Sequence, residues 1–304
     1  MNEKETNIII SRIERWHNRL PAMFVEDEQL LTAEYSWSKD PIPFARRLEK
    51  KYRKITQGVS WAKEWESSWF HLKGKIKKEW NGKIIVADLD FSGEGLVYDP
   101  KGNEIQGITN ASIWDPNFVR TRVILPKSCI NKNGVELWVE AAANSLFGIY
   151  VDPDPEQDNP KRHGSFDAKV EKMVIGIFRK DIWDLYLDAR ILYGLIERLD
   201  EKSIRRARII NTMDKAIIAF KDDTKDAESA RKILNPELSK RASSSDLKVA
   251  AVGHAHIDTG WLWPVRETIR KCARTFSTQL NLIDKYPDYI FGASMPQHYQ
   301  FMKD

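Results

Sequence analysis

The sequence has 304 residues, 42% of them hydrophobic, and its 48 basic against 44 acidic side chains leave a net charge of only +4. This length suggests about two domains, and the small charge surplus gives no indication of a nucleic-acid partner. No apolar run approaches the roughly 18 residues that cross a bilayer, no signal-peptide pattern opens the chain, and two cysteines cannot build a disulfide framework, so we expect a soluble cytoplasmic protein without a membrane partner.

Residues 2–20 predict an amphipathic helix that Pro21 ends. Its apolar side chains recur at spacings of three and four: Ile9, Ile13, Trp16 and Leu20. Residues 22–60 carry many charges and show no clear period, so we expect an irregular segment there. The first section, residues 1–60, is therefore interpreted as one helix followed by a segment that wraps another part of the protein.

Residues 61–180 predict a β-sandwich of jelly-roll-like type. Short alternating or β-branched runs, separated by Gly, Asn, Asp and Pro turn signals, cover residues 69–76, 83–91, 95–98, 119–125 and 135–141. Residues 95–107 predict a hairpin whose turn is Asp-Pro-Lys-Gly at 99–102. The proline-rich residues 152–166 are expected to form a loop, and residues 169–178 a strand that closes the sandwich.

Residues 181–246 predict a helical hairpin and a linker. Apolar side chains follow the helical period over residues 183–199 and again over 204–220, with a break between them. The charged residues 221–246 are expected to be a linker that contains one short helix.

Residues 247–304 predict the start of an α/β domain. An apolar run at 249–252 and another at 289–293 are typical of buried parallel strands. Between them, residues 262–286 predict a helix, and its apolar stripe consists of Ile269, Ala273, Phe276, Leu280 and Ile283. A second helix is expected to begin at Gln297. Since parallel sheets do not stop at two strands, we interpret this section as the first βαβ part of an incomplete, β/α-barrel-like catalytic domain, and the chain as the N-terminal piece of a longer protein of mixed fold class.

The segment between the first of these strands and the helix carries the clearest chemical signal. His254, His256 and Asp258 alternate along an extended segment, so their side chains can point the same way. Ligands bind at the carboxyl ends of strands in such folds, and two imidazoles with a carboxylate suit a divalent ion such as zinc. The alternative is structural: Asp258 or Thr259 caps the helix that follows.

The string His-Ala-His-Ile-Asp-Thr-Gly-Trp at 254–261 resembles the family 38 glycoside hydrolases, the class II α-mannosidases. The resemblance extends downstream through Trp263-Pro264, Glu267-Thr268, Arg270-Lys271 and residues 273–277. Upstream, residues 93–98 and 139–148 are similar to the N-terminal β-domain of the cytosolic or vacuolar branch. Metallo-β-lactamase-type hydrolases use His-x-His-x-Asp-His, but Thr259 stands where they have the last His, and amidohydrolases do not require the Gly-Trp pair.

The resemblance implies a zinc-dependent enzyme, with cobalt as another possible ion, that hydrolyses the α-mannosides of oligosaccharides with retention. His256 and Asp258 match two zinc ligands, and Trp261 matches the aromatic wall beneath the mannose ring. His254 matches a residue that stands beside the metal without ligating it. A homo-oligomer is a possible assembly.

In this family the nucleophile, the acid/base and the other two zinc ligands, an Asp and a His, are expected beyond Asp304. We therefore assign no catalytic residue here. Nothing in the sequence indicates that the site is faced by Asp284, Asp288 or Asp304. With two of four ligands the chain alone is expected to bind metal weakly and to be inactive.

A different interpretation treats the β-sandwich as a carbohydrate-binding or structural module attached to another metal-dependent hydrolase. Five tryptophans there could form a sugar platform or belong to the core: Trp65, Trp69, Trp80, Trp114 and Trp138. A third interpretation, a complete 304-residue protein that acts by interaction, conflicts with the unpaired parallel strand edge that it implies.

Overall fold

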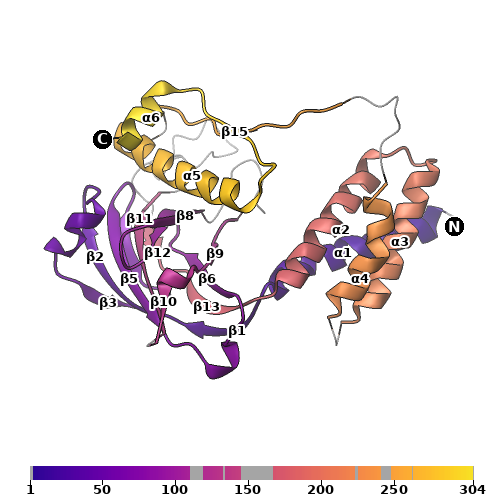
Figure 1. The fold of residues 1–304 in the computed structure, drawn as a ribbon, viewed down its shortest axis with the longest axis horizontal. Helices are drawn as coiled ribbons and strands as arrows, with labels where there is room; N and C mark the ends of the chain where they lie inside the picture. Colours follow the sequence, from indigo (N-terminus) through magenta and orange to yellow (C-terminus); the bar gives the residue numbers. More distant parts are fainter. Residues whose placement is uncertain are drawn as a thin grey trace, which may run out of the picture. The chain divides into compact units, whose positions relative to one another are not determined.

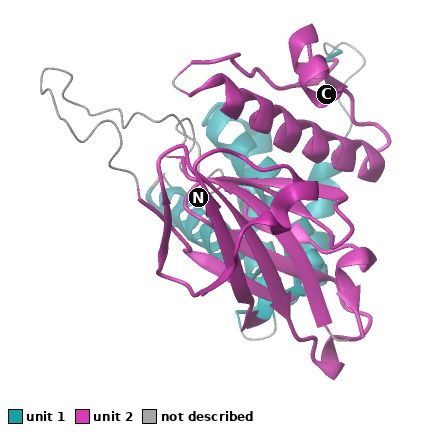
Figure 2. Cartoon of the chain, turned by 90° about the vertical axis from the view of Figure 1, so that its left-hand side faces the viewer, with its two compact units in different colours: residues 1–27, 177–249 teal, residues 28–176, 250–304 magenta. Residues whose placement is uncertain are grey.

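The computed structural model describes residues 3–109, 119–132, 134–144, 167–222, 225–240, 248–261 and 263–303. It divides into two compact units (Figure 2). Unit 1 consists of Met1–Asp27 and Ile177–Val249, and unit 2 consists of Glu28–Gly176 and Ala250–Asp304. The expected loop at 152–166, Trp114 and Asp304 lie outside the described residues.

Unit 1 is a helical bundle. Its helices are α1 (Glu3–Arg19), the short 3₁₀ helix η1 (Leu20–Met23), α2 (Lys180–Arg198), α3 (Ile204–Phe220) and α4 (Ala227–Leu238) (Figure 1). The Ser203 and Asp226 side chains cap α3 and α4 by accepting backbone N–H bonds from Arg206 and Ser229. The predicted N-terminal helix, helical hairpin and short linker helix are thus confirmed, and α1 packs with the hairpin because its apolar stripe enters the same core.

Unit 2 contains the sandwich. Its larger sheet has the order β3-β2-β5-β11-β7-β8, with β10 beside β11, and the other has the order β1-β13-β6-β9, while β12 pairs with β4. These elements are β1 (Val25–Leu30), β2 (Thr32–Ser38), η2 (Phe44–Glu49), β3 (Arg53–Ile55), β4 (Ser60–Lys63), β5 (Ser67–Gly74), η3 (Lys78–Trp80), β6 (Ile85–Asp90), β7 (Glu94–Tyr98), β8 (Glu104–Thr109), β9 (Arg122–Ile124), η4 (Lys127–Cys129), β10 (Ile130–Asn131), β11 (Gly134–Ala142), β12 (Asp167–Lys169) and β13 (Lys172–Phe178). The predicted strands and the β-sandwich are confirmed.

The expectation that residues 22–60 form an irregular wrap is wrong. They supply β1, β2 and β3, and β2 pairs with β5 from Thr32–Lys73 to Ser38–Ser67 inside the larger sheet. Along β2, buried Ala33 and Tyr35 alternate with exposed Thr32 and Glu34. Polar and apolar side chains alternate over Thr32–Ser38, which is the sequence pattern of a strand with one buried face.

The hairpin predicted over residues 95–107 is confirmed as β7 and β8, whose antiparallel register includes Gly95–Ile108 and Val97–Gln106. The Asp99 carboxylate accepts the backbone N–H groups of Lys101 and Asn103 at 2.9 and 3.0 Å. Side-chain bonds of this kind hold a turn closed, which fixes the loop between the two strands.

The C-terminal part of unit 2 holds a small parallel sheet of β14 (Gly253–His254) and β15 (Phe291–Gly292), with α5 (Val265–Lys285) between them and α6 (Pro296–Lys303) after them. The predicted βαβ order is confirmed. However, residues 249–252 form no buried strand, because Val249 is 87% exposed and the pairing begins only at Gly253. An apolar run becomes a buried strand only when both faces of its sheet are covered.

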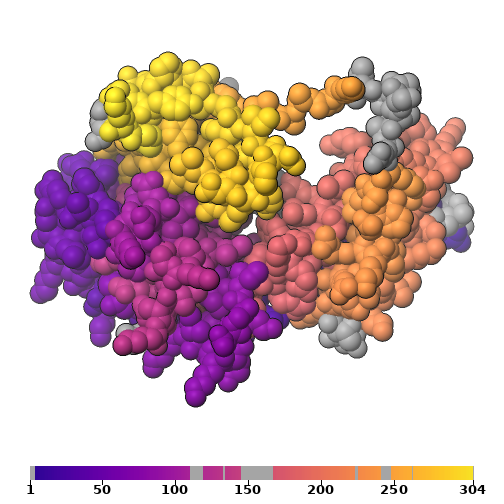
Figure 3. All heavy atoms as spheres, viewed as in Figure 1, coloured from indigo at the N-terminus to yellow at the C-terminus, as the bar shows by residue number. Residues whose placement is uncertain are grey.

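Helix α5 lies on the sandwich (Figures 1 and 3). Its polar face is buried, whereas the apolar stripe is turned outward and Leu280 is 63% exposed. Within the stripe Phe276 stacks on Tyr299 of α6, with ring centroids 5.5 Å apart. The polar face of α5 therefore carries the contacts with the sandwich that are described below.

Candidate metal and sugar site

The segment between β14 and α5 contains the residues predicted to bind metal and sugar. It leaves the small sheet at His254 and reaches α5 at Pro264, which is the N-cap residue of that helix. Pro264 makes no side-chain capping bond. The structural alternative, in which Asp258 or Thr259 caps the helix, is therefore wrong.

The side chains of His256 and Asp258 lie together, as their spacing predicted. The His256 Nε2 atom is 3.1 Å from the Asp258 Oδ1 atom, while Ile257 between them is buried. Zinc–nitrogen and zinc–oxygen bonds of about 2.1 Å at a tetrahedral angle place two ligand atoms about 3.4 Å apart, so this pair fits two ligands of one ion. The His256 side chain is 81% exposed, which leaves it open to solvent and ligands.

The other two predicted site residues, His254 and Trp261, precede and follow this pair in the sequence. His254 is exposed on β14, where its backbone is opposite Gly292. Trp261 is 52% exposed, and Trp263 supports it edge-on, with ring centroids 5.2 Å apart and planes at 90°. An exposed aromatic face of this kind suits the apolar side of a sugar ring.

Trp263 is held firmly behind Trp261. Its indole N–H lies 3.0 Å from the Thr268 hydroxyl, and the Lys271 ammonium lies 4.5 Å from the centre of its ring. A buried indole N–H with a partner and a cation over the ring fix the ring's orientation. Trp263 therefore acts as the support of Trp261.

His298, to which no role was assigned from the sequence, lies beside this segment. His298 lies in the first turn of α6, is 3% exposed, and its Nε2 atom lies 3.2 Å from the Thr259 hydroxyl. Burial lowers the pKa of His298, and the charge of His256 lowers it further. His298 thus faces the same site in its neutral form, and only contacts in the folded chain reveal it.

No group of three or more His, Cys, Asp or Glu side chains that could hold a metal ion occurs among the residues that the structure describes. Within this part of the chain, His256 and Asp258 are a nitrogen donor and an oxygen donor whose side chains lie 3.1 Å apart. Both cysteines, Cys129 and Cys272, are buried and free, and burial raises the pKa of the Cys272 thiol to about 11. Neither is suited to act as a thiolate ligand.

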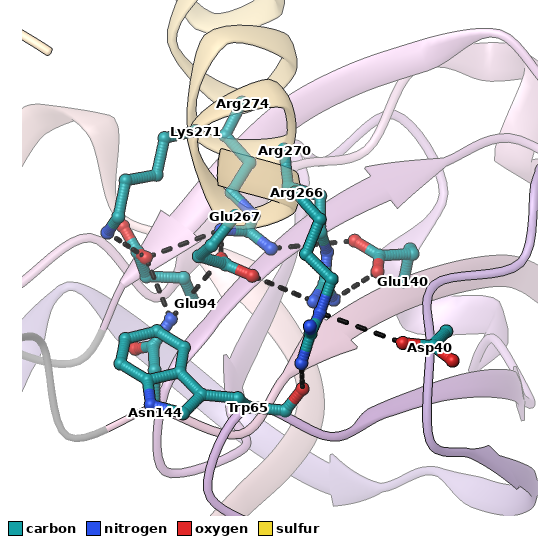
Figure 4. Close-up of polar contacts among 10 residues, drawn as sticks. All are labelled: Asp40, Trp65, Glu94, Glu140, Asn144, Arg266, Glu267, Arg270, Lys271 and Arg274. Atoms are coloured by element: carbon teal, nitrogen blue, oxygen red, sulfur yellow. Dashed lines mark hydrogen bonds and ion pairs between the residues drawn. The ribbon is translucent and has the colours of Figure 1, made fainter. Parts of the chain in front are cut away.

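A cluster of buried charges, here called the interface cluster, joins α5 to the larger sheet (Figure 4). Its three carboxylates are Glu94 on β7, Glu140 on β11 and Glu267 on α5, and its three cations are Arg270, Lys271 and Arg274 on α5. Arg274 reaches Glu267 at 2.6 Å and Glu94 at 3.3 Å, and Arg270 bonds to both Glu140 and Glu267. Equal numbers of opposite charges with mutual hydrogen bonds make such burial tolerable.

The electrostatic effect of the interface cluster appears in its shifted pKa values. Burial would raise the pKa of Glu94, but the charges of Lys271 and Arg274 outweigh it, so the pKa is lowered. Burial would likewise lower the pKa of Arg274, but Glu267, Glu94 and Glu140 raise it. Both groups therefore stay charged in the folded protein.

Helix α5 also contacts β8 at very short range. A Cβ atom on Gly107 would lie 2.8 Å from the Cβ and carbonyl oxygen atoms of Arg274, so only glycine permits this approach. The Gly107 N–H donates to the Thr278 hydroxyl at 3.0 Å, and the Ser277 hydroxyl donates to Glu104 at 2.7 Å. Packing and hydrogen bonds thus fix α5 on the sheet.

The tryptophans proposed as a sugar platform belong mainly to the core. Trp69, Trp80 and Trp138 are buried, and the Trp69 indole donates to the Ile42 carbonyl at 2.7 Å. Trp65 is half-buried, and Trp114 lies outside the described residues. The three buried rings present no face to a ligand, which argues against that platform.

Two family models match the chain. Residues 29–170 match the α-mannosidase jelly roll domain, and residues 246–304 match the N-terminal domain of the glycosyl hydrolases of family 38. The first match covers the sandwich from β2 to β12, including β2 and β3 from the segment predicted to be irregular. The second covers the His256 and Asp258 segment together with α5 and α6.

Curated relatives agree with the family models. The chain is 28% identical over 270 residues to an α-mannosidase 2C1 of Mus musculus, which covers 86% of this chain and 24% of the mouse protein. It is 28% identical to an α-mannosidase G of Dictyostelium discoideum, over 86% of this chain and 24% of that protein, and 28% identical to an α-mannosidase of Saccharomyces cerevisiae, over 88% of this chain and 25% of that protein. The chain thus spans about a quarter of the length of these relatives.

A solved β-glucuronidase from Ruminococcus gnavus aligns with 49% of this chain and 28% of its own at 14% identity, with a TM-score of 0.33, too low to indicate a shared fold. Among the described residues, no helix is both long and apolar enough to span a bilayer. Over residues 29–170 and 246–304 the chain is therefore similar to the α-mannosidases of glycoside hydrolase family 38.

Proposed function

We propose that this chain is the N-terminal part of a zinc-dependent, retaining α-mannosidase that hydrolyses terminal α-mannosides of oligosaccharides. The observation that carries the proposal is the pairing of His256 Nε2 with Asp258 Oδ1 at 3.1 Å, three residues before exposed Trp261. The names of the curated relatives, all α-mannosidases, support the substrate class.

In this proposal His256 and Asp258 hold the ion through a neutral imidazole and a carboxylate. A bound zinc ion, or cobalt in its place, supplies positive charge that holds sugar hydroxyl oxygens. Trp261 contacts the apolar face of the mannose ring and orients it. His254 stands beside the ion, where it contacts water or a ligating side chain rather than the metal.

Retention requires two carboxyl groups about 5 Å apart, one of which forms a covalent bond to the sugar. Asp284 and Asp288 are exposed near the end of α5, and we assign neither of them to catalysis. The outward apolar stripe of α5, with Leu280 63% exposed, supports a larger protein in which further residues cover it. We therefore propose that this chain alone does not turn over substrate and that the catalytic pair belongs to the rest of the enzyme.

We also propose a cytoplasmic location, which the two free cysteines support because a reducing compartment keeps thiols unpaired. The proposed partner is the mannose-containing oligosaccharide itself. A homo-oligomer stays a prediction.

Hydrolysis of an aryl α-mannoside tests this function. The complete gene product is expected to hydrolyse it with retention, whereas this 304-residue chain gives no turnover. His256→Ala in the complete product is expected to abolish turnover, and Asp284→Asn serves as the matched control that keeps it, because that carboxylate is exposed on α5. If this chain alone hydrolyses the substrate and His256→Ala abolishes that activity, the proposal that the chain is inactive by itself is wrong. If the complete product has no α-mannosidase activity, the proposed function is wrong.

A further inference from the structure

The first turn of α5 contains a hydroxyl group in an unusual position. Thr268 is fully buried, and its side chain points back toward the segment that carries His256 and Asp258 rather than into the sandwich. Its neighbours Glu267 and Arg270 point into the interface cluster instead. One turn of α5 thus contacts both the segment that carries His256 and Asp258 and the interface cluster.

The Thr268 hydroxyl uses its full hydrogen-bonding capacity on this segment. It donates to the Asp258 carbonyl at 3.0 Å, and it accepts the Gly260 N–H and the Trp263 indole N–H, each also at 3.0 Å. A hydroxyl has one donor and two acceptor sites, so all three are satisfied. Three bonds in different directions fix the rotation of the side chain and the atoms that it touches.

These bonds join the two ends of a tight turn. Gly260 has a φ of +73°, a backbone conformation that glycine adopts readily, and it lies between Asp258 and Trp263, which both bond to the Thr268 hydroxyl. The Asp258 carbonyl is bonded to the same Cα atom that carries the carboxylate, and the exposed Trp261 ring lies within the turn. A hydroxyl that fixes the backbone here therefore fixes the Asp258 carboxylate and the Trp261 ring relative to each other.

The helix that carries Thr268 is itself fixed on the larger sheet. Arg270 and Arg274 reach Glu140 and Glu94 on β11 and β7, and Gly107 on β8 packs directly against the Arg274 backbone. The position of the hydroxyl is thus set by the sandwich. Groups that orient metal ligands in this indirect way commonly change metal affinity by about 10–100-fold when they are removed.

We propose that Thr268 is a positioning residue, whose hydroxyl holds the turn of residues 258–263 so that Asp258 meets the metal ion and Trp261 meets the sugar. This inference rests on the proposed function for the identity of the ligand, but the geometry that it assigns to Thr268 does not. The sandwich acts through α5 as the support of the metal segment. Thr268 contacts neither metal nor substrate.

Two substitutions at this position separate the hydroxyl from the shape of the side chain. Thr268→Val keeps the shape and removes all three hydrogen bonds, whereas Thr268→Ser keeps the hydroxyl. Thr278→Val is the matched control: Thr278 is buried on the same helix and bonds to Gly107 and the Arg274 carbonyl, not to the turn. The measurements are hydrogen exchange of the Gly260 amide and zinc affinity, both made on the complete gene product.

Thr268→Val is expected to speed Gly260 exchange at least 10-fold and to weaken zinc binding about 10-fold or more. Thr268→Ser is expected to stay within about threefold of the wild type in both, and Thr278→Val is expected to lower stability while leaving both unchanged. Unchanged Gly260 exchange in Thr268→Val, or equal loss of zinc affinity in Thr278→Val, would overturn the inference. If the wild type binds no zinc, the proposed function fails, and Gly260 exchange still decides the role of Thr268.

Discussion

Glu267 and Arg274 lie seven residues apart on α5, and their side chains form an ion pair of 2.6 Å on the helix face that is buried against the sandwich (Figure 4). The pair belongs to a cluster of three carboxylates and three cations, in which Arg270 also bridges Glu267 and Glu140. A helix normally buries its apolar stripe, whereas α5 buries charge. The strength of the contact between α5 and the larger sheet therefore depends on the distances within these ion pairs and on the balance of their charges.

Removal of one cation from the interface cluster is expected to be costly. Arg270→Met should lower the free energy of unfolding of unit 2 by about 3–5 kcal/mol, because Glu140 and Glu267 would lose a buried partner. Arg266→Met is the matched control, since Arg266 is 44% exposed and lies 3.8 Å from Asp40, and it should change stability by at most about 1 kcal/mol. Urea unfolding followed by hydrogen exchange of α5 measures both.

The double variant Glu140→Leu with Arg270→Met tests the same cluster from the other side. Removing both partners leaves two carboxylates and two cations in the cluster, with Glu267 still paired to Arg274, so the double variant should be more stable than Arg270→Met alone. If the two losses simply add, the buried pair is not coupled, which would contradict the role that we give it.

Acid is expected to loosen the attachment of α5. The pKa of Glu94 is lowered in the folded protein because Lys271 and Arg274 outweigh its burial. A carboxyl group with a lowered folded pKa contributes stability above its unfolded pKa of 4.5, and this stability is lost as the pH falls through the folded value. Unfolding midpoints measured from pH 6 to pH 3 should therefore fall less steeply in Glu94→Gln, and an unchanged slope would contradict the assignment.

The close approach of β8 and α5 predicts opposite effects at two glycines. Gly107→Ala should destabilise unit 2 by about 1–3 kcal/mol, because its Cβ atom would overlap Arg274 and force α5 away from the sheet. Gly194→Ala meets no atom within 4 Å and lies inside α2, so it should stabilise unit 1 by about 0.5–1 kcal/mol. Thermal unfolding of both variants checks the two signs, and a neutral Gly107→Ala would contradict the packing.

Unit 1 contains a pH-dependent group of its own. His17 stacks between Tyr186 and Tyr193 at centroid distances of 4.7 and 5.7 Å, and burial lowers its pKa below 6.5. Because the unfolded chain binds the proton more readily, stability is expected to be full above pH 6.5 and to fall as the pH drops toward the folded value. NMR titration of the imidazole gives the folded pKa directly.

His17→Phe keeps a ring in this stack and should flatten the dependence of unit 1 unfolding on pH between 7 and 5.5. An imidazole at His17 that titrates at or above 6.5 would contradict the effect of burial.

The sequence predicted well those features that depend on local pattern. The spacing of His256 and Asp258 placed their side chains together, and the Asp99 turn signal located the hairpin of β7 and β8. In both, neighbours in the sequence are also the partners in space. Period two and turn chemistry are sufficient for such features.

Features that depend on distant partners were missed. The apolar stripe of α5 could be located from the sequence, but not that Glu94 and Glu140 on the sheet bind the opposite, polar face. Likewise, nothing near His298 in the sequence indicates that it meets Thr259, 39 residues earlier. Helical periodicity identifies an apolar face, but it cannot tell which partner covers either face.

Zinc titration of the metal-stripped complete gene product tests the central claim most directly, because it asks whether His256 and Asp258 hold the ion. The account predicts one tight site that His256→Ala and Asp258→Asn each weaken by at least 100-fold, with loss of α-mannosidase activity in parallel, while Asp284→Asn leaves both unchanged. Tight zinc binding and full activity that survive both substitutions would contradict it.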